Sequence, residues 1–139
     1  MEPPSWVNEY IGVPFAEKGR TKQACDCWGL LRLVLSEKFG VLVESFTEDY
    51  ASTKEAEEIR KLFQGDIAQG IWHEVDIPKI GDAVLMKMRM AGPPQHVGLV
   101  VGEGWMLHIE AGIDSCLERY DGMLWKRRIL GFYRHQLML

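Results

Sequence analysis

The sequence lacks long apolar runs, and none of its stretches approaches the roughly 18–20 apolar residues that a membrane-spanning helix needs. Its first residues, Met1 to Trp6, contain neither a basic segment nor an apolar core, so we expect no secretory signal peptide. We therefore predict a protein without a membrane span, which reaches any extracellular target by another route than a signal peptide.

Cysteine and positive charge are also scarce. The 3 cysteines are too few and too irregularly spaced for a disulfide framework. Lysine and arginine total 16 against 20 acidic residues, a net charge of −4, whereas a nucleic-acid partner requires a basic excess. We interpret the one basic cluster, Lys126–Arg128, as a solvated loop or strand edge and predict no nucleic-acid partner.

The 139 residues, 47% apolar and 26% charged, are typical of one globular domain, which we predict over residues 1–139. Residues 6–15 indicate a short helix or turn. Residues 27–39 carry an apolar face between Asp26, a predicted N-cap, and Gly40, a predicted helix end. A second helix is predicted over residues 52–63, starting at a capping box, with irregular chain after it as far as Trp72.

The second half of the sequence changes to β-like runs separated by glycine and proline. These runs cover residues 83–90, 96–101, 105–110, 113–117 and 129–134. The turn Gly102-Glu103-Gly104 predicts a hairpin that pairs the second run with the third. Helices followed by an antiparallel sheet predict the α+β class.

One cysteine and two histidines form a candidate catalytic set. Cys27 opens the apolar helix, whose N-terminus we expect to lower the thiol pKa. His96 begins one strand and can accept the thiol proton, and His108 on the next strand can orient the His96 ring. A zinc site built from these residues and Cys25 fits poorly, because structural zinc prefers C-x-x-C or H-x-x-x-H pairs. We predict no metal or cofactor, and interpret Cys25 and Cys116 as packing residues.

Several short motifs in order resemble the NlpC/P60 cysteine peptidases. They are DCWGL (residues 26–30), GDAVL (81–85), HVGLVVGEG (96–104) and LH (107–108). The resemblance implies a papain-like fold with helices packed on a central antiparallel sheet. It implies that Cys27 is the nucleophile, His96 the general base and His108 the orienting residue. It also implies hydrolysis of peptidoglycan stem peptides, often between D-γ-glutamate and the diamino acid, without a cofactor.

The same resemblance implies substrate contacts near the nucleophile, at Asp26, Trp28, Phe15 and Tyr10. Phe15 stands where many relatives have a tyrosine that helps to stabilise the oxyanion, so either Tyr10 or the backbone N–H of Cys27 replaces it, or the activity is weak. Trp28 stands where serine is common in the family, so the substrate preference of those relatives does not carry over directly.

Residues 125–134 (WKRRILGFYR) are similar to the ending of phage tail-associated members of this family. That resemblance implies synthesis in the bacterial cytoplasm, delivery to the cell wall in a virion tail, and other tail proteins as partners. Two alternatives stay open: a tail-assembly protein that keeps the fold with little activity, and an acyltransferase or amidase on a substrate outside the wall.

Overall fold

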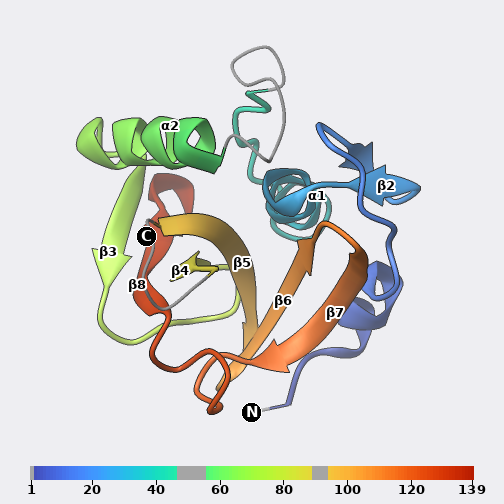
Figure 1. Ribbon diagram of the computed structural model, residues 1–139. Helices are drawn as coiled ribbons and strands as arrows, with labels where there is room; N and C mark the ends of the chain where they lie inside the picture. Colours follow the sequence, from blue (N-terminus) through green and yellow to red (C-terminus); the bar gives the residue numbers. More distant parts are fainter. Residues whose placement is uncertain (1, 47–55, 89–93) are drawn as a thin grey trace.

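The computed structural model describes residues 2–46, 56–88 and 94–139 (Figure 1). The elements in chain order are the 3-10 helix η1 (Ser5–Tyr10), strands β1 (Arg20–Thr21) and β2 (Ala24–Cys25), helices α1 (Cys27–Phe39) and α2 (Ala56–Ala68), strands β3 (Trp72–Val75), β4 (Ala83–Lys87), β5 (Pro94–Gly102), β6 (Trp105–Glu110), β7 (Ile113–Arg119) and β8 (Ile129–His135), and the 3-10 helix η2 (Gln136–Met138). No helix in the described part of the chain is long and apolar enough to cross a membrane.

Six strands form one antiparallel sheet in the order β3-β8-β4-β5-β6-β7, and β1 and β2 form a separate small ladder. The β5–β6 hairpin turns between Gly102 and Trp105, as predicted. Both helices lie on the same side of the strands in Figure 1. The predicted α+β class, with helices packed on an antiparallel sheet, is confirmed.

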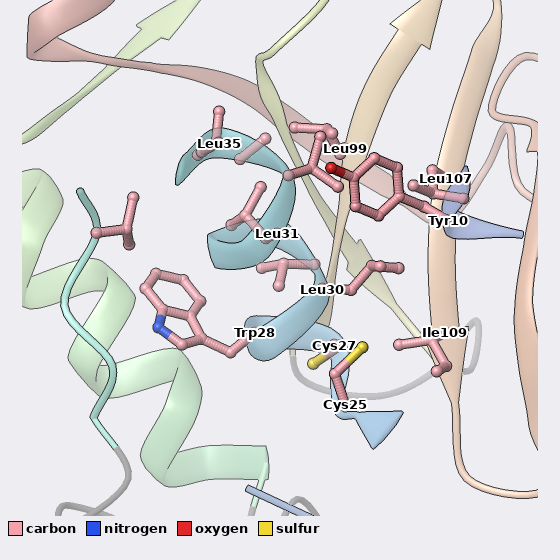
Figure 2. Packing of buried hydrophobic residues seen from close by; sticks show 14 of the residues in the cluster. Tyr10, Cys25, Cys27, Trp28, Leu30, Leu31, Leu35, Leu99, Leu107 and Ile109 are labelled. Carbon is pink, nitrogen blue, oxygen red and sulfur yellow. The ribbon is translucent and has the colours of Figure 1, made fainter. Parts of the chain in front are cut away.

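Helix α1 begins and ends at the predicted residues because both ends are capped. The Asp26 carboxylate accepts the Gly29 N–H at 2.7 Å, which satisfies one of the unpaired amides of the first turn. Gly40 ends the helix with φ of 66°, a left-handed conformation that glycine adopts without steric cost. The apolar face between these ends is buried against the sheet (Figure 2).

The sheet carries a separate apolar cluster on each face. Alternate residues of β5 and β6, including Val97, Leu99 and Leu107, belong to the main cluster with α1. The residues between them, including Val100 and Met106, pack with Trp125. Because successive side chains of a strand point to opposite faces, the even-numbered His96 and His108 lie on the Trp125 face.

Two features of the chain differ from the expectations. Helix α2 continues through Gly65 to Ala68, because one glycine costs a helix interior only about 1 kcal/mol. Trp72–Val75 is a strand, held at the sheet edge by pairing with β8, rather than irregular chain. The predicted capping box at residues 52–55 lies outside the described residues.

Candidate active site

Cys27 is the first residue of α1, and its side chain is almost fully buried, with 6% relative exposure. Figure 2 places its sulfur at the N-terminal end of the helix. The backbone N–H groups of Val97 and Trp28 interact with the Cys27 sulfur. The thiol therefore lies against β5, at the residue that directly follows His96.

The expected lowering of the Cys27 pKa is wrong for the protein without substrate. Burial raises the pKa of this thiol to about 12, and the negative charge of Asp26 adds to that rise. Burial, and then the neighbouring His108, lower the pKa of His96 to about 3. The free site therefore contains a neutral thiol and a neutral imidazole rather than an ion pair.

The two predicted histidines are in direct contact. Nε2 of His96 lies 2.9 Å from Nδ1 of His108, and both rings are buried. The rings meet edge to face, with centroids 5.2 Å apart. The hairpin of β5 and β6 thus brings together two side chains that are 12 residues apart in the sequence.

Glu118 on β7 continues this contact. Its Oε1 lies 2.9 Å from Nε2 of His108, and its Oε2 accepts the indole N–H of Trp125 at 2.7 Å. The Trp125 ring stacks on His96 at 6.1 Å and meets His108 edge-on at 5.1 Å. Trp125 is itself buried. Its ring covers both imidazoles, and its N–H holds the Glu118 carboxylate that contacts His108. We call His96, His108 and Glu118 the imidazole relay.

The Glu118 carboxylate sets the direction of the hydrogen bonds in the relay. An ionised carboxylate can only accept, so His108 donates from Nε2, and in the neutral form of this ring Nδ1 is left as an acceptor. His96 then donates its own Nε2–H to that nitrogen. The remaining nitrogen of His96, Nδ1, carries a lone pair and can act as a base.

Gly98 has no side chain and so leaves room for His108 of the imidazole relay. A Cβ at this position would lie 3.1 Å from Cε of Met86 and 3.3 Å from Cβ of His108. Both separations are tighter than an ordinary van der Waals contact. A side chain at position 98 would therefore press on the second histidine of the relay.

Cys116 is a part of this cluster and not an ordinary packing residue. It faces His108 directly across the β6–β7 pair, and its sulfur lies 3.8 Å both from Nε2 of His108 and from Oε1 of Glu118. Burial and the nearby carboxylate raise the pKa of its thiol to about 11. Of the described residues, His108, Cys116 and Glu118 form a group whose potential ligand atoms all lie within 4.8 Å of one another.

Three of the four predicted substrate-contacting side chains are buried and have partners inside the protein. Asp26 is fully buried, caps α1, and pairs with Arg20 at 2.8 Å. Trp28 is 1% exposed, and its indole N–H donates to the Glu44 carbonyl at 2.6 Å. Tyr10 is fully buried, and its hydroxyl donates to Glu37 at 2.6 Å. These contacts give all three side chains a structural role, and their contact with a substrate stays a prediction.

Phe15 is the fourth of these residues and lies near the nucleophile. Its backbone pairs with that of Cys25, two residues before Cys27. The side chain is half-buried and packs against the main cluster. Contact between Phe15 and a substrate stays a prediction.

Sequence reasoning missed Glu118 and Trp125. The signal for Glu118 was the alternation of the strand after Gly112, which puts residues 116 and 118 on one face. This alternation places Glu118 beside His108 only when the exact register of β7 on β6 is known. That register includes an irregularity between His108 and Glu110. Trp125 lies in a turn before β8, and no local pattern distinguishes it from an ordinary core tryptophan.

Residues 12–134 match the model of the NlpC/P60 family, so the chain belongs to this family. Members of the family are generally cysteine peptidases. No curated protein matches the sequence.

Solved structures of the family share the fold. The NlpC/p60 domain of the peptidoglycan hydrolase SagA is 20% identical, with a TM-score of 0.58, over 94% of this chain and 95% of that one. An NLP/P60 family protein similar to lipoprotein, from Staphylococcus aureus subsp. aureus Mu50, is 18% identical with a TM-score of 0.61, over 93% of this chain and 39% of that one. A family protein from Bacillus cereus ATCC 10987 is 15% identical with a TM-score of 0.62, over 96% of this chain and 41% of that one.

These likenesses establish the papain-like NlpC/P60 fold. The chain spans about two fifths of the length of the staphylococcal and Bacillus proteins and nearly all of the SagA domain.

Proposed function

We propose that the protein is a cysteine peptidase that hydrolyses amide bonds in peptidoglycan stem peptides. The observation that carries the proposal is that the imidazole relay includes His96, and that the backbone of the next residue interacts with the sulfur of the helix N-terminal Cys27. The relay leaves a lone pair on Nδ1 of His96, and the Cys27 sulfur interacts with the backbone of the next residue, Val97. A thiol, an imidazole base and a group that orients the base are the parts that nucleophilic acyl transfer requires.

In the proposed reaction, the thiol loses its proton as it attacks. The Cys27 sulfur bonds to the amide carbonyl carbon while Nδ1 of His96 takes the thiol proton. The imidazolium then gives that proton to the leaving amine, and the C–N bond breaks to leave a thioester. Water, deprotonated by His96, hydrolyses the thioester and restores the thiol. His108 and Glu118 stabilise the imidazolium that forms between these steps.

The oxyanion that forms in each step needs hydrogen-bond donors. The backbone N–H of Cys27 is one of the amides in the first turn of α1 that have no intrahelical acceptor, so it is a suitable donor. The helix dipole adds a partial positive charge at the same place. Phe15, in the position of the usual tyrosine, offers no donor of its own.

The proposed substrate rests on relatives. The SagA domain is described as part of a peptidoglycan hydrolase, and the motif resemblance favours cleavage between D-γ-glutamate and the diamino acid. The similarity of residues 125–134 to tail-associated members supports delivery by a phage virion. Detection of the protein in purified virions by peptide mass spectrometry would test that delivery, and its absence from them would contradict it.

Digestion of purified peptidoglycan tests the activity. We expect wild-type protein to release stem-peptide fragments, which mass spectrometry identifies by their new termini, and Cys27→Ala to release none. Cys25→Ala is the matched control, because it removes another buried thiol two residues away. Equal release by wild type and Cys27→Ala would contradict the proposal.

A second candidate function is tail assembly with little catalysis. Two observations favour it: the deep burial of the Cys27 thiol, and phenylalanine at position 15. It predicts no cleavage of walls of several chemical types, together with resistance of Cys27 to iodoacetamide. Cleavage that depends on Cys27 would exclude it.

A further inference from the structure

We propose that His108, Cys116 and Glu118 bind a divalent ion of the zinc class, and that the bound ion switches the relay off. The binding half of this proposal rests on geometry alone. The inhibitory half rests on the proposed peptidase function.

The strand register brings the three ligands to one face of the sheet. His108 on β6 is the direct cross-strand partner of Cys116 on β7. Glu118 is two residues further along β7, so its side chain points to the same face as that of Cys116. Nitrogen, sulfur and oxygen donors of this kind are the ones that zinc takes from proteins.

The separations of the donor atoms fit one tetrahedral ion. With ordinary zinc bond lengths of about 2.0–2.3 Å, ligand atoms lie about 3.3 Å apart for nitrogen and oxygen, and about 3.6 Å apart for sulfur and either of them. The observed separations are 2.9 Å for His108 and Glu118, and 3.8 Å from Cys116 to each. Shifts of a few tenths of an ångström would seat the ion.

Two neighbouring side chains already orient the ligands. A histidine that binds a metal through one ring nitrogen usually forms a hydrogen bond through the other. Nδ1 of His108 lies 2.9 Å from Nε2 of His96. Ligating carboxylates are also held by hydrogen bonds, and Oε2 of Glu118 accepts the Trp125 indole N–H at 2.7 Å. Nε2 of His108 and Oε1 of Glu118 are therefore the atoms that face Cys116.

The site is open to ions from solvent. Strand β7 is the last strand of the sheet order, and the Glu118 side chain is 30% exposed. Cys116 is also incompletely buried. Three protein ligands leave a fourth position for water, as in other open zinc sites.

Ion binding would reverse the hydrogen bonds of the relay. The ion takes the Nε2 lone pair of His108, so the ring proton of His108 must lie on Nδ1 and be donated to Nε2 of His96. His96 then carries its proton on Nδ1, the nitrogen that must accept from Cys27. Each neutral imidazole still holds one proton, and the one proton released per ion comes from the Cys116 thiol. The ion therefore removes the base without touching Cys27.

Cobalt titration of Cys27→Ala protein tests the binding half without any need for activity. Cobalt(II) replaces zinc in such sites and gives near-ultraviolet absorption when a thiolate binds it. We expect this band in Cys27→Ala, displacement of the cobalt by zinc, and loss of the band in Cys27→Ala/Cys116→Ala. Cys27→Ala/Cys25→Ala is the matched control and should keep the band. Absence of the band from Cys27→Ala, or its persistence without Cys116, would overturn the proposed site.

Peptidoglycan digestion with and without zinc tests the inhibitory half. We compare the ratio of the two rates within each protein, so that basal differences between variants cancel. Wild type should lose most of its activity with zinc and regain it with a chelator, whereas Cys116→Ala should be inhibited far less. Equal inhibition of both proteins would overturn the switch. A cobalt band in a protein that cleaves no peptidoglycan would instead retain the metal site and reject the peptidase function.

Discussion

Oε1 of Glu118 lies 2.9 Å from Nε2 of His108, and this single contact sets which nitrogen of His96 is free. Because a carboxylate cannot donate, the neutral form of each imidazole carries its proton on Nε2. The free lone pair of His96 is thereby placed on Nδ1. Glu118 on β7 thus controls which nitrogen of His96, on β5, carries the proton.

Replacement of Glu118 by glutamine tests this control. The amide can donate to His108, so the reverse arrangement of protons becomes available and the base is present only part of the time. We expect kcat to fall about 10–100-fold with little change in KM, less than the ~10⁴ that follows from loss of the carboxylate in a serine-protease triad. Steady-state kinetics measure this change.

Glu74→Gln is the matched control for that experiment, because Glu74 is exposed on β3, at the opposite edge of the sheet from β7. It should match wild type. A Glu118→Gln protein with wild-type kcat would contradict the role of the carboxylate.

Replacement of Trp125 by phenylalanine tests the support of Glu118. The change keeps an aromatic ring over both imidazoles but removes the N–H donated to Oε2. We expect the free energy of unfolding to fall by about 1 kcal/mol, with a smaller loss of kcat than Glu118→Gln shows. Urea unfolding and kinetics on the same samples would measure both, and a larger kinetic loss than that of Glu118→Gln would show that the indole acts in another way.

Replacement of Gly98 by alanine tests the packing beside His108. The new methyl group would press on Cε of Met86 and on Cβ of His108, so both stability and kcat should decrease. Adding Met86→Ala removes the first of these contacts and leaves the second. Activity that returns fully in the double variant would show that pressure on His108 does not matter.

The raised pKa values of the three thiols predict that the protein loses stability at alkaline pH. Burial is the main cause that raises the pKa of Cys25 and Cys27 to about 12 and that of Cys116 to about 11. An unfolded thiol ionises near pH 8.5, so above that pH the unfolded chain has lost protons that the folded protein retains. The contribution of the thiols to the free energy of unfolding should therefore be constant below about pH 8 and fall as the pH rises toward 11.

Urea denaturation at a series of pH values, under reducing conditions, measures this effect. Cys25→Ala should show a shallower alkaline decline than wild type, because one of the three raised thiols is removed. A decline of equal steepness in both proteins would assign the loss to other groups.

The helix that carries Cys27 and the hairpin that carries both histidines were predictable, because their signals are local. Asp26 and Gly40 mark the two ends of α1, and Gly102-Glu103-Gly104 marks the turn between β5 and β6. Period-two alternation on strands of known register then places His96 and His108 on one face.

The relay beyond His108 was not predictable, because its register is irregular. Glu110 pairs with Ile113, and a regular hairpin would put Ser115 opposite His108. The irregularity between His108 and Glu110 puts Cys116 there instead. A shift of one residue exchanges the two faces of a strand, so regular pairing would have directed Cys116 and Glu118 away from the histidine.

The ionisation of the site was predicted wrongly for a similar reason. A helix N-terminus alone lowers a thiol pKa, and this effect can be seen in the sequence. Burial of Cys27 against β5, and the charge of its own N-cap Asp26, act in the opposite direction and outweigh it. Burial depends on the packed fold and has no local sequence signal.

The most direct test of the account is nitrogen NMR of the histidine rings in substrate-free protein near pH 7. The sequence contains 4 histidines, so His96→Gln and His108→Gln would assign the two signals of the relay. The account predicts that both rings carry a proton on Nε2, with Nδ1 of His96 unprotonated. A proton on Nδ1 of His96 would contradict it, because that ring could not then accept the proton of Cys27.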